Sequence, residues 1–398
     1  MARPKKTDGE VAEKTPPAGI SFSFFQQEVE SEGVRAMLAP EIGNPEPNRT
    51  GSFNLDYDLS IPFPEGRITE VYGEEGTCKT TLTLEVAGRA LQAGKTVLYV
   101  NMEKNLNLSL MMTVRTLRPF LEKAIENMNA VAASKQPPHP ECPLWLVNAS
   151  NGEQAFESMR KFASMVPRGV AILDSIDAAQ PSAVLSGEIG ENKVGNLAKL
   201  MSDAMRKLIS VTEQNKVALI FVNQIRDKIT MYGDPTDTPG GRAVKFYASQ
   251  RIRLQKPGKA QILTDSDGQR IGVVIRYKVV KNKVAPDGCE GEFPILFKNG
   301  IFREQELVTK CCNFGVLRLG GKGGQQVFLP KLDRKTNDFV KTKEGEREET
   351  CMSQFNAARR LLMDSTLAVK LEAELLSKMS VGGLDPVDSL TDEIQDVE

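Results

Sequence analysis

The sequence predicts an α/β protein with a largely parallel, twisted sheet and helices on both faces. Apolar runs of strand length recur at residues 67–72, 96–100, 170–173 and 217–222. Helical stretches lie between these runs, and alternating strands and helices are typical of a parallel sheet covered on both sides. A glycine-rich turn follows the first run, at the edge where such sheets bind ligands beyond the carboxyl ends of their strands.

The composition fits a soluble globular protein. The 398 residues are 40% hydrophobic and 26% charged, and a chain of this length can form one large domain and one or two smaller ones. It has no apolar run of about 18 residues, so we expect no membrane contact. The charged N-terminus lacks the apolar stretch of a secretory signal. Six cysteines without a CxxC pair, and a single histidine, argue against a disulfide scaffold or a Cys/His zinc site and favour a cytoplasmic location.

The charge balance restricts the kinds of partner. A net charge of −1 argues against a generally basic coat protein for nucleic acid, but a local basic surface would still allow DNA binding. Acidic residues gather at the C-terminus, where no basic residue follows Lys378. We expect residues 381–398 to form an acidic tail, which is either simply solvated or competes with DNA for a basic surface.

Changes in pattern divide the rest of the chain into three segments. Residues 1–49 are polar, contain proline at both ends, and are interpreted as an N-terminal arm or polymerisation segment. Residues 50–300 carry the regular alternation of strands and helices. After residue 300 a glycine-rich segment leads to a helical stretch at 349–379, which predicts a small α+β domain over residues 301–380.

The strand at 67–72 is followed by a turn and a helix over residues 79–93. Regularly spaced leucine and alanine residues give this helix an apolar face, and Gly94 ends it. Farther along, four closely spaced prolines predict an extended surface connection over residues 122–143.

The turn between the first strand and helix has the pattern of a phosphate-binding loop. In such loops backbone N–H groups hold the phosphates, the lysine reaches the β- and γ-phosphates, and the following hydroxyl holds magnesium. The usual pattern, GxxxxGK[ST], has a glycine where this chain has Cys78. We predict that ATP and Mg2+ bind here, with Thr80 as a metal ligand, and that the ATP-binding residues are Gly73, Glu74, Glu75, Gly76, Thr77, Cys78, Lys79, Thr80 and Thr81.

Two carboxylates follow later strands. Asp174 ends the strand that begins at Val170, where a carboxylate that supports magnesium belongs, although an aspartate there is also a common helix cap. Glu103 follows the strand at 96–100 and could orient or deprotonate the water that attacks the γ-phosphate. A surface glutamate ahead of a helix would have the same spacing.

From residue 50 onward the chain contains a series of distinctive segments. TGSFNLDYDL and GRITEVYG precede the phosphate loop, and NGEQAFE and GEIGENKVGNLAKLMSDAMRKL follow it. IFVNQIRDKI, PGGRAVKFYASQRIRL and YKVVKNKVAP come next. In these segments and in their order the chain resembles the bacterial RecA recombinases. The match covers residues 50–300 and continues weakly to 379. It implies a RecA-type P-loop ATPase core with an N-terminal arm and a small C-terminal domain.

The resemblance implies catalytic roles at matching positions. Lys79 corresponds to the P-loop lysine, and Glu103 to the glutamate that activates water. Gln224 corresponds to a glutamine that senses the γ-phosphate and relays its presence to DNA. Two further lysines correspond to side chains that reach the phosphates of the neighbouring subunit, as an arginine finger would, so that hydrolysis would require a helical filament. The implied subunit-contact residues are Lys245, Phe246, Lys281 and Lys283.

The resemblance also assigns DNA binding to two loops, at residues 188–196 and 226–242. Such loops can contact phosphates and insert apolar side chains without reading the base sequence. This suits a protein that accepts any single strand and leaves the test of homology to base pairing. The implied DNA-binding residues are Val194, Gly195, Asn196, Lys199, Arg206, Arg226, Lys228, Ile229, Tyr232, Gly240, Gly241 and Arg242.

Several positions depart from the family's pattern. Cys78 replaces the loop glycine, and Val194 stands where the family commonly has a methionine that inserts between bases. Leu110 and Glu304 stand near positions where the family places tyrosines around the adenine. These departures bear on nucleotide preference and turnover.

Together these features predict an ATP-dependent recombinase that polymerises on single-stranded DNA, pairs it with homologous double-stranded DNA, and exchanges strands in recombinational repair. Two alternatives stay open. A hexameric helicase or motor on the same fold would need an arginine finger and a closed ring. A non-hydrolysing mediator that loads a partner recombinase is favoured by Cys78 and disfavoured by Glu103 and the two lysines.

Overall fold

The computed structural model describes residues 29–30, 43–134, 143–186, 195–227, 236–256, 262–265, 267–333, 335–336 and 338–381. The chain divides into two compact units, Met1–Pro45 and Glu46–Glu398. Most of the predicted arm and nearly all of the predicted acidic tail lie outside the described residues. The segment boundaries expected from the sequence stay predictions.

The second unit is built on a ten-stranded sheet, which confirms the predicted α/β class. Its parallel part has the strand order β8 (Gln250–Gln255), β1 (Ile68–Gly73), β5 (Ala218–Gln224), β4 (Val170–Asp174), β2 (Val97–Asn101) and β3 (Leu144–Val147). Beyond β8 the sheet continues with antiparallel strands β10 (Arg270–Asn282), β11 (Glu290–Leu296), β12 (Gly300–Ile301) and β9 (Ile262–Thr264).

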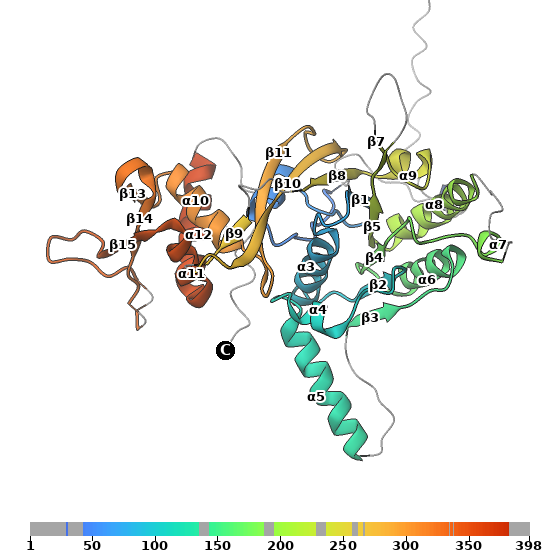
Figure 1. The fold of residues 1–398 in the computed structure, drawn as a ribbon, viewed down its shortest axis with the longest axis horizontal. Helices are drawn as coiled ribbons and strands as arrows, with labels where there is room; N and C mark the ends of the chain where they lie inside the picture. The colour runs from blue at the N-terminus through green and yellow to red at the C-terminus, as the bar shows by residue number, and fades with distance from the viewer. Residues whose placement is uncertain are drawn as a thin grey trace, which may run out of the picture. The chain divides into compact units, whose positions relative to one another are not determined.

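Helices cover both faces of the parallel strands (Figure 1). On one face lies α3 (Lys79–Gln92), with α2 (Phe53–Leu59) and α4 (Leu108–Met112) nearby. On the other lie α6 (Gly152–Met165) and α8 (Asn196–Gln214).

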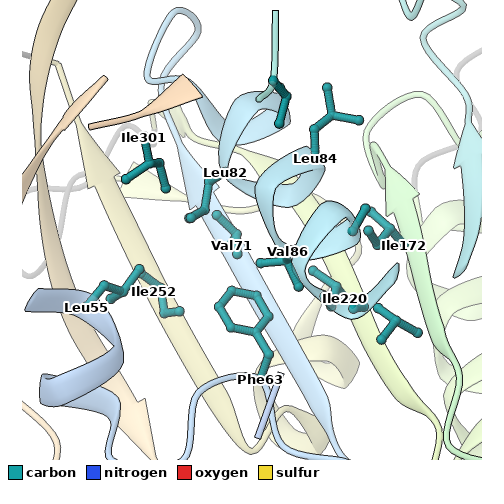
Figure 2. Close-up of a cluster of buried hydrophobic side chains, with 14 of the residues drawn as sticks. Leu55, Phe63, Val71, Leu82, Leu84, Val86, Ile172, Ile220, Ile252 and Ile301 are labelled. Atoms are coloured by element: carbon teal, nitrogen blue, oxygen red, sulfur yellow. The ribbon is translucent and has the colours of Figure 1, made fainter. Parts of the chain in front are cut away.

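The pleat of the strands divides the apolar residues between two cores. On β5, Ile220 belongs to the core under α3, whereas Leu219 and Phe221 belong to the core under α6 and α8. Figure 2 shows part of the first core, including Val71 of β1 and Leu82 of α3. Because the central strands are buried on both faces, they appear in the sequence as continuous apolar runs.

The expected extended connection over residues 122–143 was wrong over most of its length. Helix α5 (Arg118–Ser134) occupies that stretch. The prolines that suggested an extended chain begin only at Pro137, after the helix has ended, and the residues before them are mostly good helix formers.

Residues beyond β12 form a third apolar core around α10 (Arg303–Asn313) and a sheet of β13 (Arg318–Gly320), β14 (Gln326–Pro330) and β15 (Glu349–Ser353). The helix expected over 349–379 begins five residues later than predicted and is split in two, α11 (Gln354–Met363) and α12 (Ser365–Val381). The Ser353 hydroxyl accepts a hydrogen bond from the backbone N–H of Asn356, so Ser353 caps α11 and ends the strand before it.

A buried carboxyl group joins this C-terminal part to the large sheet domain. Glu306 on α10 accepts hydrogen bonds from the Ser52 hydroxyl (2.7 Å) and from the backbone N–H groups of Phe53 (3.2 Å) and Asn54 (3.1 Å) at the start of α2. Its oxygens thus satisfy N–H groups at the start of the helix that have no partner within the helix.

In the part of the chain that the structure describes, none of the helices combines the length and apolar character needed to cross a membrane.

Candidate functional site

The predicted phosphate loop joins the end of β1 to the start of α3, at the carboxyl edge of the parallel strands. A side chain could not replace the hydrogen of Gly73, because its Cβ would lie 2.4 Å from the carbonyl oxygen of Leu254. Cys78, which precedes α3, has φ 58° and ψ 30°, in the left-handed region that favours glycine. Its side chain is half-buried against the core under α3, and burial raises the pKa of its thiol.

The loop lysine is held within the loop. The Lys79 ammonium donates hydrogen bonds to the carbonyl oxygens of Gly73 (3.0 Å) and Glu74 (2.8 Å), and the Thr77 hydroxyl also donates to Glu74 (2.8 Å). Burial lowers the pKa of Lys79, while the carboxylates of Asp174 and Glu103 oppose that shift. The ammonium group therefore lies at the N-terminus of α3, where a phosphate would bind.

Asp174, at the end of β4, meets the first turn of α3. Its Oδ2 accepts hydrogen bonds from the Thr80 hydroxyl (2.7 Å) and from the buried Tyr99 hydroxyl (2.8 Å). The Thr83 hydroxyl lies 3.2 Å from that of Tyr99. Burial raises the pKa of Asp174 above its ordinary value, and the two hydrogen bonds oppose this shift only in part. A hydroxyl and a carboxylate are oxygen ligands of the kind that Mg2+ prefers, so this pair fits the ion in a nucleotide site.

Glu103 lies beside Asp174 with each carboxylate oxygen held. Its Oε1 accepts hydrogen bonds from the Ser175 hydroxyl (2.6 Å) and from the side-chain amide of Gln224 (3.3 Å). Its Oε2 accepts one from the side-chain amide of Asn105 (2.9 Å). The structure thus brings together Glu103 and Gln224, the two residues for which the resemblance implies roles at the γ-phosphate.

The predicted subunit-contact residues gather elsewhere on the chain. The Lys281 ammonium donates to the carbonyl oxygens of Lys245 (2.7 Å) and Phe246 (3.2 Å). Phe246 is 71% exposed, and Lys283 is also exposed. Lys281 lies on β10, which β8 separates from β1 in the sheet. On its own chain, Lys281 is thus two strands away from β1, the strand that leads into the phosphate loop.

The inner ends of the two predicted DNA loops meet. A Cβ on Gly241 (φ +71°) would lie 2.8 Å from Ala198 in α8, and one on Gly240 would lie 3.2 Å from Met201. Arg242 is exposed at the start of α9 (Arg242–Tyr247). Four more of the predicted DNA-binding residues are on or next to α8: Gly195, Asn196, Lys199 and Arg206.

Not all of these residues are equally available to DNA. Lys199 is exposed, whereas Arg206 forms an ion pair with Asp203 at 2.6 Å. Arg226 lies in the short strand β6 (Arg226–Asp227), which pairs with β7 (Thr236–Asp237), and its side chain is outside the description. Val194, Lys228, Ile229 and Tyr232 lie outside the described residues.

Sequence reasoning missed several polar residues in and behind the site. Tyr99 sits inside the apolar run at 96–100, which predicted a strand but not the hydrogen bond from its hydroxyl to Asp174. Glu70 in β1, Asn223 in β5 and Arg251 in β8 form a buried hydrogen-bonded set. A buried charged residue inside a predicted strand was the available signal, but its partners depend on the order of strands in the sheet.

The chain is similar to one protein-family model and to several known proteins. The family model described as "RecA N-terminal domain" matches residues 39–115 and 142–302. Protein RecA of Aquifex pyrophilus is 32% identical over 313 residues, which cover 78% of this chain and 82% of the relative. Protein RecA of Streptomyces venezuelae is 36% identical over 317 residues, covering 79% and 75%. Protein RecA of Streptomyces rimosus is 38% identical over 318 residues, covering 79% and 76%. The crystal structure of the RadB recombinase aligns with 64% of this chain and 98% of its own, with a TM-score of 0.43 and 19% identity.

Proposed function

This chain belongs to the RecA family of ATP-dependent DNA recombinases, and we propose that it uses ATP and Mg2+ to form a helical filament on single-stranded DNA and exchange strands with a homologous duplex. The observation that carries the proposal is the hydrogen bond between Thr80 and Asp174, next to Lys79. Glu103 lies close by and accepts a hydrogen bond from Ser175, the residue after Asp174. The proposed place of action is the cytoplasm, which holds both ATP and chromosomal DNA in bacteria.

In the proposed nucleotide site, Thr80 and Asp174 hold the metal, which would neutralise charge on the β- and γ-phosphates. Lys79 exchanges its hydrogen bonds to the carbonyl oxygens of the loop for bonds to phosphate oxygens. These bonds, 3.0 and 2.8 Å long, hold the ammonium at the loop to which the phosphates would bind.

Glu103 is the proposed acceptor of a proton from the attacking water. Its hydrogen bonds from Ser175, Gln224 and Asn105 fix the orientation of the carboxylate. Gln224 contacts this carboxylate directly and stands at the end of β5, where the chain leaves toward the second predicted DNA loop. A change in the contact between Glu103 and Gln224 would therefore reach that loop.

The exposed surface around Lys281, Lys283, Lys245 and Phe246 is the proposed contact with the next subunit. Lysines contributed in trans would stabilise the transition state only in an assembled filament, which links hydrolysis to polymerisation. Double-stranded DNA is the second proposed partner, because strand exchange requires it.

The relatives named Protein RecA do not favour a helicase or a mediator. Within the site, the carboxylate of Glu103 with its three donors is a further observation against a non-hydrolysing protein.

The test is magnesium-dependent ATP hydrolysis with and without single-stranded DNA of arbitrary sequence, followed by strand exchange between homologous substrates. The proposal predicts that DNA stimulates hydrolysis and that Lys79→Ala abolishes both activities. Lys161→Ala, on the exposed face of α6, is the matched lysine control and should behave as wild type. DNA binding without hydrolysis in the wild type would favour the mediator instead.

A further inference from the structure

Asn223 lies in the interior of the sheet domain and connects two stretches of the chain by hydrogen bonds. Its side chain is fully buried at the end of β5. The amide donates hydrogen bonds to Glu70 Oε1 (2.9 Å) and to the carbonyl oxygen of Pro239 (3.0 Å), and its oxygen accepts one from the backbone N–H of Gln224 (3.0 Å). Asn223 thus fixes the chain at Gln224, just before the predicted second DNA loop, and at Pro239, near the end of that loop.

Glu70 continues this connection across the sheet. It lies fully buried in β1, and its Oε2 accepts a 2.5 Å hydrogen bond from Arg251 Nε on β8. The guanidinium of Arg251 also lies over the ring of Tyr72, 4.6 Å from its centroid. Asn223, Glu70 and Arg251 therefore join three adjacent strands, β5, β1 and β8.

The two ends of this set reach two different functional surfaces. Arg251 pairs in register with Lys281 on β10. Burial and the positive charges of Lys283 and Arg251 lower the pKa of Lys281, while Glu70 opposes the shift, so the buried pair acts electrostatically on the lysine. At the other end, Gln224 donates to Glu103 in the nucleotide site.

A purely structural ion pair would be the simpler explanation. Burying a carboxylate and a guanidinium costs free energy, and such pairs often add little to net stability. A structural pair would also need no third partner, yet Glu70 uses its second oxygen for Asn223, whose own bonds go to the chain at Gln224 and Pro239. Hydrogen bonds thus lead from Glu103 through Gln224, Asn223 and Glu70 to Arg251. Arg251 then lies beside Lys281 as its register partner in the sheet.

We propose that Asn223, Glu70 and Arg251 are positioning residues that couple the Glu103–Gln224 end of one nucleotide site to Lys281, and so to the nucleotide site of the next subunit. The proposal rests on the proposed filament and its trans lysines. When Gln224 changes its contact with Glu103, Asn223 transmits the movement to Glu70 and Arg251, and Arg251 shifts the strand that presents Lys281. Successive sites along the filament then hydrolyse ATP cooperatively.

Glu70→Gln tests this coupling with almost no change in side-chain volume. Glutamate accepts hydrogen bonds at both oxygens, whereas glutamine must turn an N–H donor toward either Asn223 or Arg251, so one link breaks. Glu65→Gln is the matched control, because Glu65 is also buried and paired, with Lys95 at 3.0 Å and Arg168 at 3.3 Å. It precedes β1, at the edge of the sheet opposite the nucleotide site.

The measurements are the melting temperature, hydrolysis without DNA, stimulation by single-stranded DNA, and the Hill coefficient for ATP. Both variants should lower the melting temperature and keep hydrolysis without DNA. Only Glu70→Gln should reduce DNA stimulation, by roughly three- to tenfold, and bring the Hill coefficient toward 1. Asn223→Ala, which leaves the Glu70–Arg251 pair in place, should have the same effects as Glu70→Gln. Arg251→Lys keeps the positive charge and should therefore lose less cooperativity than Glu70→Gln.

Equal effects of Glu70→Gln and Glu65→Gln on stimulation and cooperativity would overturn the coupling and leave a structural ion pair. If Glu70→Gln does not fold, Asn223→Ala decides the question by the same two readouts. A wild-type protein whose hydrolysis does not respond to DNA would contradict the proposed function itself, which separates that failure from a failure of the coupling.

Discussion

The Thr80 hydroxyl donates a 2.7 Å hydrogen bond to Asp174 although the two residues lie 94 positions apart in the sequence. Thr80 is in the first turn of α3, directly after β1, and Asp174 is the last residue of β4. Both stand at the carboxyl edge of the parallel strands, where a nucleotide bound to the phosphate loop would place its metal.

We predict that Asp174→Asn lowers ATP hydrolysis by roughly 100-fold and raises the Mg2+ concentration needed for half-maximal activity. The amide removes a negative charge from the ion, and a bound metal contributes several kcal/mol to transition-state stabilisation. Hydrolysis measured across a magnesium titration checks this. Tyr99→Phe is the control, because it removes one hydrogen bond to Asp174 and keeps the carboxylate. An Asp174→Asn variant no worse than Tyr99→Phe would contradict the metal role.

Cys78 supplies a prediction about the departure in the phosphate loop. Its φ of 58° costs a residue with a Cβ about 1–2 kcal/mol, which glycine avoids. Cys78→Gly and Cys78→Ala both lose the half-buried sulfur and differ mainly in the Cβ. We therefore expect Cys78→Gly to be more stable than Cys78→Ala by about 1 kcal/mol in urea unfolding. Equal stabilities would mean that the residue does not hold the left-handed conformation.

The sequence was sufficient to predict residues whose position follows from the strand–turn–helix pattern. Thr80, Asp174 and Glu103 all follow strands of one parallel sheet, and the carboxyl ends of such strands share an edge, so their meeting could be anticipated. The buried set behind the site could not. Glu70 meets Asn223 and Arg251 because β1 lies between β5 and β8, and strand order is not contained in any local pattern.

The connection between the large sheet domain and the C-terminal part was invisible for the same reason. Glu306 and Ser52 are 254 residues apart, and nothing near either residue in the sequence marks the contact. Helix α5 was missed for a different reason. The prolines that begin at Pro137 were taken as evidence that the residues before them are also extended, but those residues form the helix.

Glu306 should make stability depend on pH. Burial raises its pKa to about 8 in the folded protein, from an ordinary value of 4.5. The folded protein therefore holds a proton that the unfolded chain has lost between pH 4.5 and 8. This contribution to the free energy of unfolding is complete below pH 4.5 and disappears as pH rises toward 8, by roughly a few kcal/mol.

The measurement is the free energy of unfolding at intervals from pH 5 to pH 8.5. Glu306→Gln cannot ionise and should flatten the curve, while keeping an acceptor for two of the three donors at Ser52, Phe53 and Asn54. Glu157→Gln, at an exposed residue of α6, should leave the slope unchanged. The hypothesis fails if Glu306→Gln keeps the wild-type slope.

Gly241 carries the last prediction, because it sets how closely the second predicted DNA loop approaches α8. It has φ +71°, and a Cβ there would meet Ala198 at 2.8 Å. Gly94, after α3, has the same φ of +71° but nothing within 4 Å of its ideal Cβ. Alanine at Gly94 costs about 1 kcal/mol of backbone strain. Gly241 has ψ −156°, a conformation that is essentially restricted to glycine, so alanine there costs about 1–3 kcal/mol of strain. Gly241→Ala must also push the chain away from α8, at an additional cost of about 1 kcal/mol or more.

Only the displacement at Gly241 should reach DNA, because Lys199 lies one residue beyond Ala198 on the same helix. We expect Gly241→Ala to weaken binding of labelled single-stranded DNA several-fold, as measured by fluorescence anisotropy, and Gly94→Ala to bind as wild type. If both variants lose the same stability and the same affinity, backbone strain alone explains the loss. A larger effect of Gly241→Ala on affinity would mean that close packing between the loop end and α8 is what presents the DNA-binding residues.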